Sequence, residues 1–207
     1  MIELILKGGI FIYPIILCSV IALAIFIERL WVLRRSRIIP ADFIRHIEDL
    51  LKKRKISDAA FLCQGDGSSI ARIFLAGLKN TGRGMWLVKD AIEERGGREA
   101  LSLEKHVGIL STIANLTPLL GLLGTVSGMI KTFNVISVQG VGDPAPLAGG
   151  IAEALITTAS GLCVAIPTLV CHRILKDKAE SLVFEMEENS IKMIEIMENY
   201  SARDREP

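Results

Sequence analysis

The chain has 207 residues, of which 50% are hydrophobic and 23% are charged, and its net charge is +1 at pH 7. Its mean hydropathy of +0.43 is too high for an ordinary soluble domain of this size. A nearly neutral chain also gives no electrostatic reason to expect a nucleic-acid partner. Because so apolar a chain still contains 23% charged residues, the charged residues must be segregated from the apolar ones along the sequence.

Three apolar runs are each long enough to cross a bilayer, which takes about 20 residues. They cover residues 8–27, 107–130 and 144–171, and only the last contains a charge, Glu153. The first run is longer than the core of a signal peptide and basic residues follow it, so we expect a retained helix. We assign residues 1–33 to an N-terminal segment with the first transmembrane helix, 106–136 to the second helix and 148–173 to the third.

The remaining residues form a charged stretch at 34–105, a link at 137–147 and a tail at 174–207. Fifteen lysines and arginines lie in the charged stretch and six lie from Arg173 onward, whereas the link has none. Cytoplasmic segments of membrane proteins carry such an excess of basic residues. We therefore expect the charged stretch and the tail in the cytoplasm, and the N-terminus and the link on the outer side.

Apolar periodicity predicts helices throughout the charged regions. The predicted segments are 41–51, 57–62, 70–78 and a long helix from residue 85 that runs directly into the second transmembrane helix. The tail repeats apolar residues with a period of 3.5 and should extend the third transmembrane helix. No strand pattern stands out, so the predicted fold is an all-α integral membrane protein whose three transmembrane helices have long cytoplasmic helical extensions.

Small and hydroxyl-bearing residues follow one face of each of the last two transmembrane helices. In the second helix they are Pro118, Gly121, Thr125, Gly128 and Thr132, and in the third they are Ala154, Thr158, Gly161, Ala165, Thr168 and His172. Steps of three and four residues place each set on one helical face. Such faces indicate either close packing between transmembrane helices or a helix bundle around something polar. Both interpretations remain open at this point.

Glu153 stands in an apolar run, where a carboxylate costs about 2.5–3.5 kcal/mol on insertion scales. Such a residue usually has a function or pairs with another helix. It also lies only a few residues beyond the outer link, where capping or pairing near the membrane surface would reduce this cost. Both roles remain open at this point.

Motifs for other chemistries fail on inspection. Gly121, Gly124 and Gly128 lack the Lys-Ser/Thr and the preceding strand of a nucleotide-binding loop, and the spacing of the last two is that of a helix contact. The four cysteines form no CxxC pair, and the three histidines are scattered. We expect no cofactor, no metal site and no enzymatic activity.

Two segments carry a more specific pattern. Residues 119–130 read LLGLLGTVSGMI, and residues 149–158 read GGIAEALITT, a pattern that continues through Gly161 to Pro167. Together they resemble the signature of the MotA/TolQ/ExbB proton-channel family. The resemblance covers all three transmembrane helices and their order. The three-helix layout is similar to the ExbB and TolQ branch, because the flagellar stator branch has an additional span.

The resemblance implies a homo-oligomeric ring, with a pentamer expected, in the bacterial inner membrane. A single-span partner of the ExbD/TolR type would pass through its pore and carry the aspartate that binds and releases the proton. Proton flow would then drive motion that is transmitted to the envelope, with a TonB-like or TolA-like protein as a further partner. Membrane lipid would surround the ring.

The resemblance also implies roles for individual residues. Thr125 and Thr158 match the family's pore-lining threonines, and Glu153 matches the family's glutamate near the outer end of the third transmembrane helix. Helix packing and the pore face would involve Pro118, Gly121, Gly124, Gly128, Thr132, Ala154, Gly161, Ala165 and Pro167. In this reading Glu153 orders the subunit interface or the ion pathway rather than relaying protons itself.

Several alternatives remain open. The driven system could be TonB-dependent transport, a TolQ-like role in envelope integrity and cell division, or gliding. Of these we favour TonB-dependent transport. The transported ion could be sodium rather than a proton. From another class of protein, a non-conducting membrane scaffold would use the same small-residue faces for packing alone.

Overall fold

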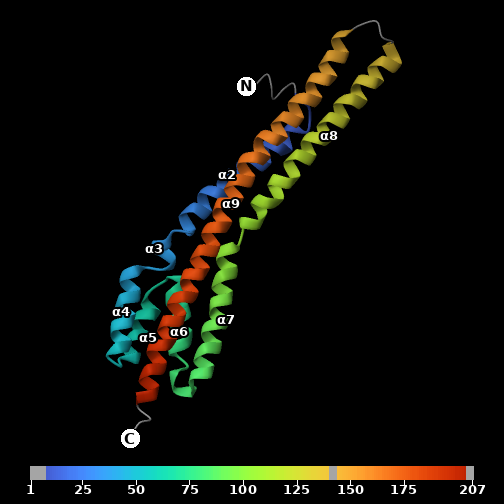
Figure 1. The fold of residues 1–207 in the computed structure, drawn as a ribbon. Helices are drawn as coiled ribbons and strands as arrows, with labels where there is room; N and C mark the ends of the chain where they lie inside the picture. Colours follow the sequence, from blue (N-terminus) through green and yellow to red (C-terminus); the bar gives the residue numbers. More distant parts are fainter. Residues whose placement is uncertain (1–7, 140–143, 204–207) are drawn as a thin grey trace. The chain divides into compact units, whose positions relative to one another are not determined.

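The computed structural model describes residues 8–139 and 144–203, which form helices and contain no strand (Figure 1). The predicted all-α fold class is confirmed. The chain divides into two compact units. The first unit comprises residues 1–29 and 106–174, and the second comprises residues 30–105 and 175–207.

Three helices are long and apolar enough to cross a membrane, as expected. They are α2 (Ile12–Val32), α8 (Val107–Gln139) and α9 (Pro144–Arg203). Within the first unit, α8 and the beginning of α9 run side by side (Figure 1). The third predicted span and the tail form the single helix α9, so α9 contributes residues to both units.

The helices extend into both ends of the predicted outer link at 137–147. Residues 137–139 belong to α8, residues 144–147 belong to α9, and residues 140–143 lie outside the described part of the chain.

The prediction that the helix beginning at residue 85 continues into the second span was wrong. Helix α7 (Met85–Glu104) ends before α8 begins, and His106 between them has φ +67°. A non-glycine residue in this left-handed region cannot continue a right-handed helix and costs about 1–2 kcal/mol. A tertiary contact stabilises the break: the Nδ1 atom of His106 lies 2.9 Å from Nη2 of Arg29, a side chain that is only 6% exposed.

The second unit contains the short helices between α2 and α7. They are α3 (Arg35–Ile38), α4 (Ala41–Lys52), α5 (Ile56–Gly65), α6 (Ser69–Leu78) and the 3₁₀ helix η1 (Thr81–Arg83). The predicted helices at 41–51, 57–62 and 70–78 correspond to α4, α5 and α6. The hydroxyl of Ser68 accepts a hydrogen bond from the backbone N–H of Ala71 and so begins α6.

Helix α6 lies at the centre of the second unit, where it packs against α5 and α7. Its residues Ile70, Ile73, Phe74 and Leu78 are buried, together with apolar residues around them. The largest fully buried side chains of this unit are Leu33, Ile39, Ile47, Ile70, Ile73, Phe74, Val88 and Leu175. The amphipathic pattern of the charged stretch thus builds a separate hydrophobic core around α6.

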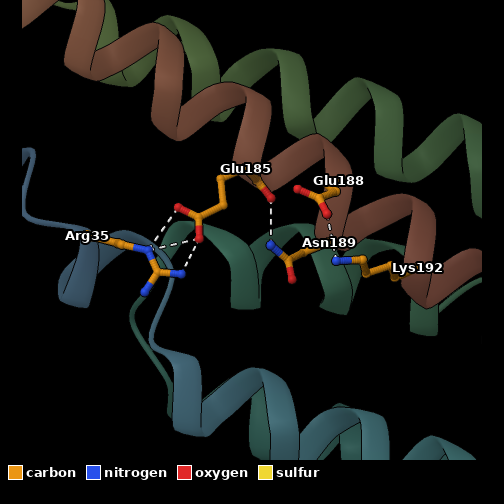
Figure 2. Close-up of polar contacts among 5 residues, drawn as sticks. All are labelled: Arg35, Glu185, Glu188, Asn189 and Lys192. Carbon is orange, nitrogen blue, oxygen red and sulfur yellow. Dashed lines mark hydrogen bonds and ion pairs between the residues drawn. The ribbon is translucent and has the colours of Figure 1, made fainter.

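Ion pairs tie the α9 part of the second unit to the segment that follows α2. Figure 2 shows Arg35 facing Glu185, with its Nε 2.9 Å from each carboxylate oxygen and its Nη2 also bonded to Oε1. This hydrogen bonding lowers the pKa of Glu185 and raises that of Arg35. Further along α9, Lys192 lies 2.7 Å from Glu188, and this hydrogen bond raises the pKa of the lysine (Figure 2).

A second charged cluster joins α6 to α7. The carboxylate of Glu99 is 5% exposed and accepts two hydrogen bonds from Arg72, of 3.0 and 2.7 Å, and Arg95 lies 2.8 Å from Oε1. A carboxylate can be buried at this depth because two guanidinium groups satisfy it.

Candidate functional site

The backbones of α8 and α9 come into contact at glycines. A methyl group at Gly121 would lie 3.0 Å from the Cα of Thr158, and one at Gly128 would lie 2.8 Å from the carbonyl oxygen of Gly150. A methyl group at Gly161 would lie 2.5 Å from the carbonyl oxygen of Thr117. Any side chain at these positions would separate the helices. Transmembrane helices that lack a hydrophobic driving force associate through such close approaches.

Two threonine hydroxyls lie at the edge of this contact. The hydroxyl of Thr158 donates to the carbonyl oxygen of Gly121 on the facing helix at 3.0 Å. The hydroxyl of Thr125 donates to the carbonyl oxygen of Leu122 in its own helix at 2.6 Å. Each hydroxyl proton is thus engaged, while the oxygen lone pairs can still accept hydrogen bonds from water or from a protonated acid.

The buried face of the helix pair is rotated slightly from the predicted stripes. On α8 it includes Thr117, Gly121, Gly124, Gly128 and Thr132, and on α9 Ala154, Thr157, Gly161, Ala165 and Thr168. Pro118, Thr125 and Thr158 are only half-buried, and Pro167 is exposed. Part of the surface of each of these residues is therefore not covered by its own chain. Their predicted place along a pore stays a prediction.

Sequence reasoning missed two buried threonines, Thr117 and Thr157, which are both fully buried. The hydroxyl of Thr157 lies within hydrogen-bond distance of the carbonyl oxygens of Gly8, at 2.8 Å, and Glu153, at 2.7 Å. Its methyl group faces Gly124. The signal was present in the adjacent threonine pair at 157–158, but spacing alone does not show which of the two is buried.

Glu153 pairs with a lysine on the neighbouring helix. Its Oε1 lies 2.5 Å from Nζ of Lys131, and the glutamate side chain is 19% exposed. Gly9, with φ +65°, packs so closely on the same carboxylate that a Cβ atom there would collide with it. The pair thus joins α8, α9 and the segment before α2. The ammonium group offsets the cost of placing a carboxylate in an apolar run.

The described residues of this unit show no arrangement of side chains for metal binding. Among residues 8–139 and 144–203, no group of three His, Cys, Asp or Glu side chains could hold a metal ion. Cys18, Cys163 and Cys171 of this unit are free thiols, as is Cys63 of the second unit.

Comparison with known proteins matches the sequence of this chain to a family. Residues 66–188 match the MotA/TolQ/ExbB proton channel family. An ExbB-like 1 biopolymer transport protein of Synechocystis sp. is 39% identical over 178 residues, which cover 82% of this chain and 68% of that protein. Biopolymer transport protein exbB1 of Vibrio cholerae is 28% identical over 192 residues, which cover 86% of this chain and 80% of that protein.

A Tol-Pal system protein TolQ of Pseudomonas aeruginosa is 35% identical over 127 residues, which cover 56% of this chain and 55% of that protein. Residues 66–188, which match the family, include α8 and the part of α9 that packs against it. The glycine contacts, the threonine hydroxyls and the paired glutamate described above all lie within it. This chain belongs to the MotA/TolQ/ExbB proton channel family and, within it, to the ExbB/TolQ branch.

Proposed function

We propose that this protein is the proton-conducting subunit of a motor in the bacterial inner membrane, which couples the proton motive force to an envelope process. One observation carries the proposal: the hydroxyls of Thr125 and Thr158 lie half-buried at the edge of the α8–α9 contact. Each hydroxyl already donates to a backbone carbonyl, and within an apolar region its remaining lone pairs are best satisfied by a polar partner or by water. Lipid offers neither.

The hydrogen bonds of these threonines suggest how they act. Thr158 donates to Gly121, so its oxygen is free to accept from the protonated carboxyl of a partner's membrane aspartate. To bind the ionised carboxylate, the hydroxyl must rotate away from the Gly121 carbonyl. The preferred contact therefore changes with the protonation state of the partner, as a proton-driven motor requires.

The proposed assembly is a homopentamer with an ExbD/TolR-like single-span protein in its pore. The N-terminus and the link near residues 137–147 would face the periplasm, and the second unit would lie in the cytoplasm. The basic residues of 34–105 and of the tail support this orientation. In this assembly the paired Glu153 has an ordering role at the outer end of α9.

TonB-dependent transport is the favoured system. The ExbB-named relatives from Synechocystis and Vibrio cholerae align with more than four-fifths of this chain, whereas the TolQ relative from Pseudomonas aeruginosa aligns with 56%. A TolQ-like role in envelope integrity is the alternative. Deleting the gene distinguishes them: loss of growth on chelated iron indicates the first role, and sensitivity to detergent with chained cells indicates the second.

The test of conduction is proton uptake by vesicles that contain this protein and its co-expressed single-span partner. Thr158→Val removes a hydroxyl whose hydrogen bond to an ionisable group is worth about 1.5–3 kcal/mol, so uptake should fall about tenfold or more. The control is Thr112→Val, which removes an exposed hydroxyl of α8 outside the contact face. Unchanged uptake in Thr158→Val would remove the pore-lining role, and no uptake by the unaltered complex would favour a scaffold.

A further inference from the structure

The second unit contains a groove between α7 and the end of α9 that its own side chains do not fill. Its volume is about 640 Å³. The floor is apolar and includes Ile73, Ile92 and Met186, which are all buried. Ile191 on its wall is 56% exposed. An apolar groove flanked by two helices is a typical docking surface for an amphipathic helix.

Two adjacent glycines keep the groove open. Gly96 and Gly97 lie within α7, and a Cβ atom at either position would meet nothing within 4 Å. Each glycine destabilises a helix interior by about 1 kcal/mol relative to alanine. Neither a positive φ nor packing within the chain explains them, whereas the glycines of α8 lie against α9. The bare backbone at 96–97 is suited to the close approach of another helix.

The rim of the groove is acidic. Four glutamates and one lysine line it, which gives a net charge of −3: Glu93, Glu187, Glu195, Glu198 and Lys89. Lys89 lies 2.6 Å from Glu198, so its charge is already matched within the chain. Glu93, Glu187 and Glu195 are exposed. A complementary occupant therefore carries lysine or arginine beside its apolar face.

We propose that this groove binds a basic amphipathic helix, supplied by the cytoplasmic segment of the single-span partner. The proposal rests on the proposed function, which places the second unit in the cytoplasm beside that partner. A single-span protein with its main part outside carries its excess of lysine and arginine on the cytoplasmic side. The occupant's apolar side packs on the floor and its basic residues face the glutamates.

The test uses the full-length protein in nanodiscs of phosphatidylcholine, whose neutral surface does not attract basic peptides. Two labelled peptides of about five helical turns are compared by fluorescence anisotropy. One alternates leucine and lysine at amphipathic spacing, and the other replaces every lysine with glutamate. Empty nanodiscs give the background. The lysine peptide should bind at least tenfold more tightly, and salt should weaken it.

Matched variants locate the binding site. Gly97→Leu fills the groove and should weaken binding at least tenfold, while its higher helix propensity keeps α7 folded. Glu93→Gln should weaken binding about twofold to fivefold. Glu94→Gln removes the same charge one residue away on α7, outside the groove, and should leave binding unchanged. Circular dichroism checks that each variant is folded.

Three results would overturn the proposal. The first is equal binding of the lysine and glutamate peptides. The second is binding that Gly97→Leu does not weaken. The third combines two findings: the unaltered protein binds no peptide, and Gly97→Leu forms a smaller oligomer by light scattering. That result would assign the groove to a second copy of this chain. Peptide binding needs no proton flow, so the two experiments are independent. Absence of peptide binding would not change the vesicle result for Thr158→Val, and absence of proton uptake would not change the peptide-binding result.

Discussion

The contact between α8 and α9 makes a quantitative prediction for Gly161. Its alanine variant would place a methyl carbon 2.5 Å from the carbonyl oxygen of Thr117. One helix must then move by about 1 Å to restore an ordinary separation of about 3.5 Å. Forcing an extra methyl group into a packed contact costs about 1–3 kcal/mol. Because the obstacle is backbone, no side-chain rotation can relieve it.

The matched control is Gly149→Ala. Gly149 lies in the same helix, and an added Cβ there meets nothing within 4 Å. Both variants gain the same helix propensity, about 1 kcal/mol, so their difference isolates the steric term. For a chain of this size each kcal/mol shifts the unfolding midpoint by about 2–4 °C, so Gly161→Ala should unfold about 2–12 °C below Gly149→Ala.

The assay is thermal unfolding of the two purified variants in one detergent, followed by size-exclusion chromatography after heating. Loss of the monodisperse peak gives the midpoint of each variant. Equal midpoints for Gly161→Ala and Gly149→Ala would show that the backbones of α8 and α9 are not in contact there. The glycine-based helix contact would then be wrong.

Three further predictions follow from the charged and buried groups. Lys131→Met removes the ammonium 2.5 Å from Glu153 and should destabilise the protein by at most about 1 kcal/mol, because this lysine is 54% exposed. In a Glu153→Gln background the same change should have little further effect. Arg35 lowers the pKa of Glu185, so this carboxylate stabilises the fold above the unfolded glutamate value of about 4.3, and the stabilisation is lost as the pH falls below it. Glu185→Gln should therefore lower the unfolding midpoint at pH 7, and this difference should shrink as the pH falls below about 4.3. Burial raises the pKa of Cys63 to about 12, so its thiol should react slowly with iodoacetamide at pH 8.

Each of these has a measurement that can contradict it. For the Lys131 pair, fully additive midpoint shifts in the double variant would show that the two side chains do not interact. For Glu185, a difference between variant and unaltered protein that does not shrink as the pH falls below about 4.3 would assign its effect to packing rather than to charge. For Cys63, the labelling rate of the folded protein is compared with that of the unfolded protein, and equal rates would contradict its burial.

Much of the fold follows from the order of apolar and charged residues. In a bilayer every backbone polar group must be satisfied within the chain, so an apolar run such as 107–130 can only form a helix. Amphipathic spacing likewise predicted α4, α5 and α6, because a helix at the edge of a core must bury one stripe. The small residues of α8 and α9 indicated a helix contact, which the glycine distances bear out at Gly121, Gly128 and Gly161.

Spacing could not determine the rotation of each helix about its axis. Thr157 and Thr158 point about 100° apart, yet either one lies three and four residues from Ala154 and Gly161, so both fit the same stripe. Which one is buried depends on what packs against it, here Gly124 and the Gly8 carbonyl. For the same reason Thr125 appeared central to the predicted stripe but lies at its edge in the structure.

Apolar run length, charge distribution and helical periodicity are properties of neighbouring residues, so the sequence alone determined the three membrane-spanning helices, the all-α class and the helical charged regions. Contacts between distant residues followed only from the packed chain. The ion pair of Lys131 with Glu153, the break at His106 beside Arg29 and the open groove at Gly96 each join segments far apart in sequence. Their geometry depends on how the helices pack, which no pattern of neighbouring residues specifies.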